Sequence, residues 1–261
     1  MQKQSNLGCL KETKVNIPIS ESQLEIAGTL RGDYSLPLAV LAPGLGGWEN
    51  DLLLFNASRF LGQMGIATLR VSFYGDGEKQ RNIRDFDVKS NASDIDAVVD
   101  YVKEQGSRWV CVIGHSYSGM AIVYSNKQAF DNAVLWDPSH TDGYDEPQAK
   151  KNLETDFMYI EELDSYVSAH GSGYVLSRRV FEDYAPGSSV MAKNFAVDTL
   201  VANAGKSGEA MQRFGRDYAD SISAETEHIV IPDASHPFTE DGAMEKLFAE
   251  TARWIKQKLV Q

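Results

Sequence analysis

Hydrophobic positions along the chain fall into short runs that alternate with longer stretches of helical periodicity. Two extended segments come first, at residues 14–19 and 23–30. From about residue 37, the apolar runs predict strands at residues 36–41, 66–73, 108–113, 132–136, 199–203 and 227–231. The periodic stretches predict helices at residues 51–64, 91–104, about 116–127, 209–221 and 242–260. This alternation of strand and helix indicates an α/β fold with a mostly parallel sheet covered by helices.

The stretch at residues 91–104 illustrates the periodicity. Apolar side chains recur at positions 95, 98, 99 and 102, which is the spacing of one helix face. Asp94, Asp96 and Asp100 interrupt this pattern, and we expect them to lie on the outer, solvated face.

The strongest candidate for chemistry is the turn Gly114–Gly119, which reads GHSYSG between a predicted strand and a predicted helix. A serine hydroxyl needs to be presented freely and to have a base beside it before it attacks a substrate. A sharp strand-to-helix turn presents it, provided that the residues two before and two after the serine are small. Gly114 and Ser118 meet this requirement. The spacing predicts a nucleophile elbow with Ser116 as the nucleophile.

Four segments together resemble the α/β-hydrolase superfamily, and most closely its small-cap esterases, the cinnamoyl/feruloyl esterase-like and acylaminoacyl-peptidase-like proteins. They are Pro43–Trp48, similar to the H-G-F-G-G oxyanion loop; Arg70–Gly77, similar to R-x-D-F-x-G-H-G; the elbow; and Ala234–Phe238, which matches the segment that carries the catalytic histidine. The resemblance extends from residue 25 to nearly the end of the chain. It departs from the family at Pro43 and Asp76, where the family often has histidine.

The resemblance implies one α/β-hydrolase domain over residues 1–261, with a cap inserted at residues 139–190. It implies His236 as the general base, because this histidine follows the last strand at the edge where parallel-sheet sites assemble. It also implies an oxyanion hole made by the backbone N–H groups of Tyr117 and Leu45. No metal or organic cofactor is implied.

The acid of a serine–histidine–acid catalytic triad is left open by the sequence. The family's aspartate follows the strand at residues 199–203, and its position falls on Ser207, which carries no charge. Asp137, at the end of the preceding strand, is the favoured replacement, and Glu209 is the alternative. A serine–histidine pair without an acid, or an inactive site, is the remaining possibility.

The expected cap is rich in aromatic residues, which either wall a substrate pocket or pack the cap onto the core. They are Tyr144, Phe157, Tyr159, Tyr166, Tyr174, Phe181 and Tyr184. Acidic residues of the same segment disfavour an anionic substrate. They are Asp156, Glu161, Glu162 and Asp164.

Composition narrows the class of partner. The formal net charge of −12 argues against a nucleic acid or an anionic membrane as partner, since both require basic patches. Two cysteines make no disulfide framework, and neither a signal peptide nor a membrane span is visible, so we expect a cytoplasmic protein acting on a small molecule.

The expected activity is hydrolysis of a carboxylic ester or thioester through an acyl-enzyme on Ser116. The alternatives are an inactive binding protein of the same fold, or an acyltransferase or peptidase on the same site.

Overall fold

The computed structural model describes residues 10–20, 22–141, 157–168, 175–182 and 186–260. Its centre is an eight-stranded sheet with the order β1-β2-β4-β3-β5-β6-β10-β11. β1 and β2 are antiparallel to each other, β2 is antiparallel to β4, and all remaining pairs are parallel. The strands are β1 (Glu12–Pro18), β2 (Glu25–Arg31), β3 (Leu38–Ala42), β4 (Ala67–Ser72), β5 (Val110–His115), β6 (Asn132–Trp136), β10 (Thr199–Ala204) and β11 (Thr226–Ile231).

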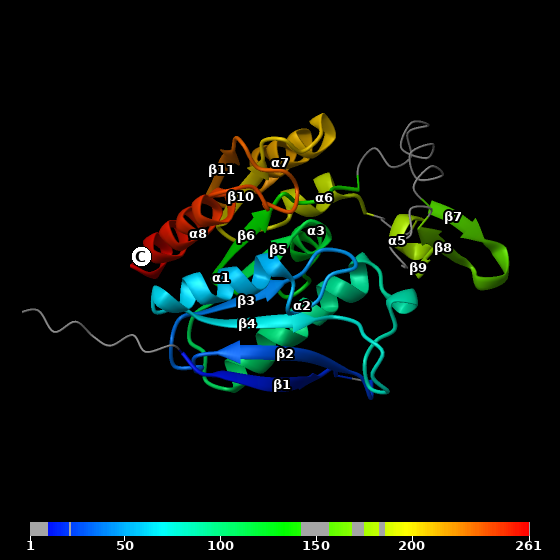
Figure 1. The fold of residues 1–261 in the computed structure, drawn as a ribbon, viewed down its shortest axis with the longest axis horizontal. Coiled ribbons are helices and arrows are strands. Elements are labelled where there is room, and N and C mark those ends of the chain that lie inside the picture. Colours follow the sequence, from blue (N-terminus) through cyan, green and yellow to red (C-terminus); the bar gives the residue numbers. More distant parts are fainter. Residues whose placement is uncertain (1–9, 21, 142–156, 169–174, 183–185, 261) are drawn as a thin grey trace, which may run out of the picture.

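Helices cover both faces of this sheet (Figure 1). α1 (Leu52–Gln63) and α8 (Ala243–Leu259) bury their apolar sides on one face. The other face is covered by α2 (Val88–Glu104), α3 (Tyr117–Val123), α6 (Ser188–Lys193) and α7 (Glu209–Ser221). Alternate residues of β3 therefore enter different clusters: Leu38 and Val40 pack under α2, whereas Leu41 packs under α1. Burial on both faces explains why the central strands are continuous apolar runs.

The predicted elements of this sheet and its large helices are confirmed, with boundaries that differ by a few residues. The largest difference is at α3, which ends at Val123 rather than near residue 127. The carboxylate of Asp96 accepts hydrogen bonds from the N–H groups of Asn126 and Lys127 and from the Ser125 hydroxyl. These contacts hold the chain in a turn where the sequence alone suggested more helix.

The structure also corrects the expectation that the three aspartates of α2 lie on its solvated face. Asp94 and Asp96 are buried rather than solvated, and only Asp100 remains partly exposed. Both Asp94 oxygens accept from the Arg81 guanidinium, at 3.1 and 2.8 Å. Burial raises the pKa of Asp94 to about 6, even though Arg81 acts in the opposite direction. The carboxylates lie inside because α2 packs against neighbouring segments on more than its apolar face.

Residues 139–190 contain a small antiparallel sheet that the sequence did not predict. It consists of β7 (Phe157–Ile160), β8 (Ser165–Ser168) and β9 (Val175–Ser177), with the 3₁₀ turn η2 (Glu161–Leu163) between β7 and β8. It lies to one side of the main sheet (Figure 1), against the 3₁₀ turn η1 (Ile83–Asp85). Arg179, the first residue of α5 (Arg179–Glu182), forms an ion pair with Asp87 over 3.4 Å.

Several residues of the expected cap lie outside what the structure describes. They are Tyr144, Asp156, Tyr174 and Tyr184, together with the side chain of Phe181. Phe157, Tyr159 and Tyr166 belong to β7 and β8, where the Tyr159 and Tyr166 rings pack at 5.2 Å. Among the described residues, no helix is both long and apolar enough to cross a bilayer.

Candidate active site

Ser116 lies in a strained turn between β5 and α3. Its backbone has φ 54° and ψ −115°, a conformation that is unusual for a residue with a side chain and is found at functional sites. A Cβ atom at Gly114 would lie 2.6 Å from the backbone of Ser118, so this position requires glycine. Ser118 is accommodated because its hydroxyl turns away and donates to Asn91 Oδ1 at 3.1 Å.

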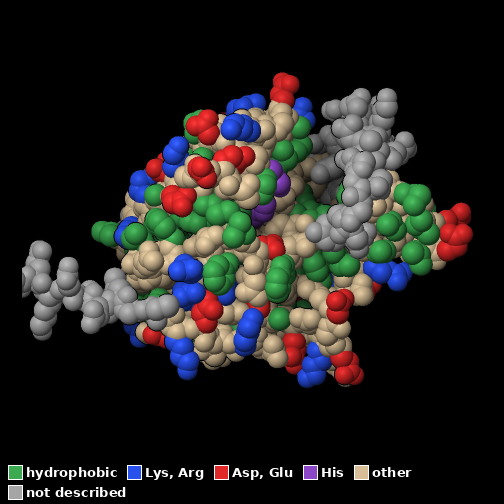
Figure 2. Space-filling model, in the orientation of Figure 1, with side chains coloured by type: hydrophobic (Ala, Val, Ile, Leu, Met, Phe, Trp, Pro, Cys, Tyr) green, Lys and Arg blue, Asp and Glu red, His purple; other side chains and the backbone are tan. Residues whose placement is uncertain are grey.

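His236 lies beside this turn, on the loop between β11 and α8. Its Nε2 is 3.0 Å from the Oγ of Ser116, and its Nδ1 is 2.6 Å from the Oδ2 of Asp137. The ring is held over the site by its loop, in which the Phe238 side chain is fully buried and its N–H bonds the Ser235 carbonyl at 2.8 Å. Figure 2 shows histidine side chains reaching the surface near the middle of one face. The structure thus brings the candidate nucleophile and the candidate base into hydrogen-bond distance.

Asp137 follows β6 directly and is fully buried. Its Oδ1 accepts from Asn203 Nδ2 at 2.9 Å and from the Ala204 N–H at 3.1 Å, and its Oδ2 accepts from His236 and from the Ser207 hydroxyl. Burial alone would raise the pKa of Asp137, but these four donors outweigh burial and hold the pKa below its ordinary value. The carboxylate is therefore an anion at neutral pH.

Glu209, the alternative acid, is not brought to the histidine. It is the first residue of α7 and is exposed to solvent. The Nδ1 atom that an acid would have to approach already faces Asp137. A carboxylate at the start of a helix also complements the helix dipole, which accounts for Glu209 without chemistry.

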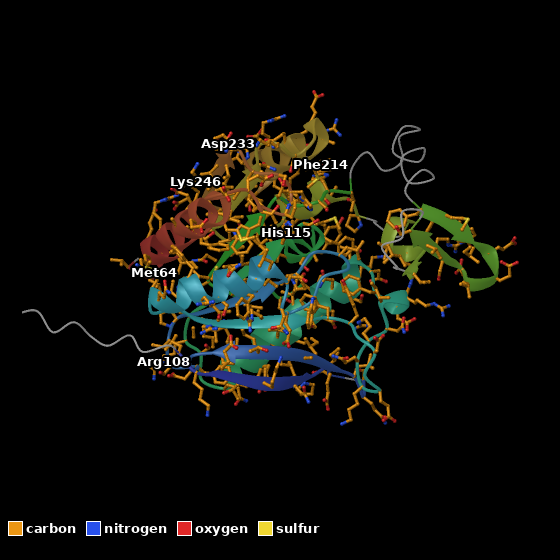
Figure 3. All side chains as sticks on the ribbon, in the orientation of Figure 1. Met64, Arg108, His115, Phe214, Asp233 and Lys246 are labelled. Atoms are coloured by element: carbon orange, nitrogen blue, oxygen red, sulfur yellow. The ribbon has the colours of Figure 1, made fainter. Side chains whose placement is uncertain are left out.

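His115 supports the loop that carries His236. Its Nε2 lies 3.0 Å from the backbone oxygen of His236, and the two imidazole rings pack with centroids 4.7 Å apart. Burial, and then the neighbouring His236, lower the pKa of His115 to about 4. The ring is therefore neutral at pH 7, and because its partner is an acceptor, Nε2 carries the proton and donates it. Figure 3 labels His115 in the centre of the molecule, among the ends of the central strands.

The glycine-rich loop after β3 runs along the elbow. A Cβ atom at Gly44 would lie 3.2 Å from the Cβ of Ser116, and the Gly47 N–H closes a turn onto the Gly44 carbonyl at 2.9 Å. Leu45 lies inside this turn, and Tyr117 is the first residue of α3. The two predicted oxyanion donors therefore belong to segments that meet at Ser116. N–H groups at a helix start attract developing negative charge.

Sequence reasoning missed two side chains of this site. Ser139 has its Oγ 3.4 Å from the Ser116 Oγ, and its N–H bonds the Ser116 carbonyl at 3.1 Å. Ser207 was noted only as a lost acid, although the structure places its hydroxyl on Asp137. A signal existed for Ser207, because it falls at the acid position of the family, but none pointed to Ser139. In the described part of the chain, His, Cys, Asp and Glu form no group of three or more that would hold a metal ion.

The fold and this turn define a class, that of α/β proteins with a mostly parallel sheet and a strand–serine–helix turn at its carboxyl edge. The chain belongs to the α/β-hydrolase family, whose sequence profile matches residues 39–254. This confirms the resemblance and the fold class inferred from the sequence. A search of curated protein sequences found no match.

Solved structures with this fold are similar over almost the whole chain. Est1E from Butyrivibrio proteoclasticus, solved with ferulic acid bound, is 16% identical with a TM-score of 0.77, and the match covers 95% of this chain and 100% of Est1E. A dienelactone hydrolase from Anabaena variabilis is 16% identical with a TM-score of 0.70, covering 96% of this chain and 99% of that protein. Mouse alpha/beta hydrolase domain-containing protein 10 is 13% identical with a TM-score of 0.71, covering 94% and 99%. Identities this low show the fold alone.

Proposed function

We propose that this protein is a serine hydrolase that cleaves a carboxylic ester or thioester. The observation that carries the proposal is the continuous hydrogen-bonded chain from Ser116 through His236 to Asp137, with Ser116 at a strained turn. A nucleophile, a base within reach and a group that orients the base are the parts that covalent catalysis by serine requires.

In the proposed reaction, the Ser116 Oγ attacks the carbonyl carbon of the ester while His236 Nε2 takes the hydroxyl proton. The N–H groups of Tyr117 and Leu45 stabilise the resulting oxyanion. The C–O bond to the alcohol then breaks, and His236 returns the proton to the leaving oxygen. Water attacks the acyl-enzyme by the same route and releases the carboxylic acid. Throughout, the anionic Asp137 holds the imidazole in one orientation and stabilises its protonated form.

The substrate we propose is a small, uncharged ester. Est1E with bound ferulic acid and the dienelactone hydrolase share this fold, which supports an ester or lactone as the type of bond. The net charge of −12, with Glu161, Glu162 and Asp164 in the expected cap, disfavours an anionic substrate or a nucleic acid.

We further propose that residues 139–190, including the β7–β9 sheet, form a cap on a single α/β-hydrolase domain. Acyl transfer and peptide hydrolysis use the same groups and differ in the acceptor or the leaving group.

The competing function is an inactive binding protein of the same fold, which the serine at position 207 favours. A fluorophosphonate probe separates the two, because it reacts only with an activated serine. We expect mass spectrometry to find one adduct on Ser116 in the folded protein, and none in the Ser116→Ala variant or in denatured protein. Ser35→Ala, at an exposed turn, should label like the wild type. A folded wild type that stays unlabelled and cleaves no p-nitrophenyl ester would favour the binding protein.

A further inference from the structure

We propose that Ser207 is a positioning residue, whose hydroxyl fixes the carboxylate of Asp137 in the orientation that serves His236. This inference rests on the proposed function, and it assigns a role to an uncharged side chain whose hydroxyl donates to Asp137. It starts from the convergence of two donors on one atom: the Ser207 hydroxyl and the His236 Nδ1 both bond the Oδ2 of Asp137.

The arrangement of donors around Asp137 explains why this hydroxyl matters. Asn203 and Ala204 hold Oδ1 only, so they leave the other oxygen to His236 and Ser207. Asp137 is fully buried, and an oxygen of a buried carboxylate that lacks a donor is costly. With Ser207 in place, both oxygens keep a fixed donor even when the imidazole moves during proton transfer. The carboxylate therefore does not need to reorient within the catalytic cycle.

The backbone of Ser207 is tied to the loop that carries the histidine. The Lys206 N–H bonds the Ala234 carbonyl at 2.7 Å, two residues before His236, and the Gly205 N–H bonds the Ile231 carbonyl at 2.8 Å. The approach at Gly205 is so close that a Cβ atom there would lie 2.3 Å from the Pro232 carbonyl oxygen. These backbone hydrogen bonds fix the position of Ser207 relative to the loop of His236, and its hydroxyl bonds Asp137.

The chemical type of the side chain fits this role. A hydroxyl donates to the carboxylate without adding charge, so it stabilises the anion while Asp137 keeps its full negative charge opposite the protonated imidazole. A lysine there would neutralise the carboxylate, and a second carboxylate would repel it. Hydrogen bonds from Ser207 and the other three donors also lower the pKa of Asp137, in line with the geometry.

The test compares Ser207→Ala with Ser207→Thr, which keeps the hydroxyl, and Ser207→Cys, which keeps the volume with a weaker donor. Hydrolysis of p-nitrophenyl acetate is followed as a function of pH. For Ser207→Ala we expect kcat to fall about tenfold, equal to 1.4 kcal/mol, with KM within about twofold of the wild type. We expect the acid limb of the kcat/KM profile to move to higher pH, because a carboxylate with one donor fewer binds the protonated imidazole more strongly. Ser207→Thr should restore most of kcat, and Ser207→Cys should lie between.

A control removes the hydroxyl of another serine, one that is exposed and donates to a backbone carbonyl. Ser223→Ala deletes a bond of 2.9 Å to the Phe195 carbonyl beyond the end of α7, and should keep the wild-type rate and profile. A Ser207→Ala enzyme with the kcat and pH profile of the wild type would overturn the proposal. So would a loss of activity that follows a lowered melting temperature without any shift of the profile, since this is what a structural role alone produces. A folded wild type whose Ser116 does not react with the fluorophosphonate probe and which cleaves no p-nitrophenyl ester would instead overturn the proposed function, and the role of Ser207 with it.

Discussion

At the scale of single residues, the site depends on ionisation states that neighbouring groups impose. Asp137 is buried yet anionic because four donors surround it, and His115 is neutral because it is buried beside another imidazole. Ser116 keeps a strained backbone because Gly114 leaves room for the turn. Each of these conditions can be removed by a single substitution.

The first such substitution is Asp137→Asn, which preserves shape and removes the negative charge. We expect kcat for ester hydrolysis to fall by roughly 10³–10⁴-fold, since the amide neither stabilises the protonated imidazole nor holds the correct tautomer. Glu209→Gln is the control at the alternative acid, and it should stay within about twofold of the wild type because this side chain is exposed and does not face His236. The opposite ranking of the two variants would contradict the assignment of the acid.

The second prediction concerns the pH dependence of stability. The pKa of His115 is about 4 in the folded protein, against an ordinary value of 6.5, so the unfolded chain binds more protons between these two pH values. The contribution of His115 to the free energy of unfolding is therefore present above pH 6.5 and is lost as the pH falls towards 4. A shift of this size corresponds to about 3 kcal/mol.

Urea titrations of the wild type and of His115→Gln between pH 4 and pH 7.5 measure this contribution. The stability of the wild type relative to the variant should decrease as the pH is lowered. The buried Asp94 titrates in the same range, but it is present in both proteins, so it cancels in the difference. A difference that does not change with pH would show that His115 is not held neutral by its surroundings.

At the scale of elements, the site is assembled from the carboxyl ends of neighbouring strands. Ser116 follows β5, Asp137 follows β6, Ser207 follows β10 and His236 follows β11. These four strands are adjacent and parallel, so the side chains that follow them meet at one edge of the sheet. The site therefore depends on how firmly the outer strands and their helices are packed.

The packing of α8 offers a test at this scale. Leu247 is fully buried in the cluster beneath α1 and α8, and Leu247→Ala should lower the free energy of unfolding by about 2–5 kcal/mol through the cavity it creates. Lys246→Ala, the neighbouring exposed position labelled in Figure 3, should change it by less than about 0.5 kcal/mol. Chemical denaturation provides both values, and equal effects of the two variants would contradict this packing.

At the scale of the whole molecule, the strands of the main sheet and its mostly parallel character were predictable from periodicity and from the alternation of strands with helices. The central strands are apolar throughout, and the large helices have one apolar face, so both patterns are visible in the sequence. Burial of Asp94 and Asp96 was not visible, because it depends on Arg81 and on the end of α3, which reach α2 only in three dimensions. The β7–β9 sheet escaped prediction because its strands are only three or four residues long and most of their residues are only partly buried, so they show no clear alternation of buried and exposed positions.

The site was predictable to a different extent. Ser116 and its turn were expected from a local motif and His236 from the family resemblance, whereas the carboxylate beside His236 depended on which strand end approaches this histidine. That approach is a tertiary fact, so Asp137 and Glu209 stayed open until the loops were placed. The contacts of Ser139 and Ser207 belong to the same category.

The docking of α8 has a consequence for the time at which activity arises. The Trp136 indole N–H bonds the Thr251 hydroxyl at 3.0 Å, and Phe60 packs on Phe248 at 5.8 Å, so the segment after His236 joins the body of the protein through α8. On the proposed mechanism, a polypeptide still emerging from the ribosome has its serine early but lacks a working imidazole until α8 is made and docked. Ester turnover would then report the docking of α8, and a chain in which α8 is not yet docked would be protected from premature acylation.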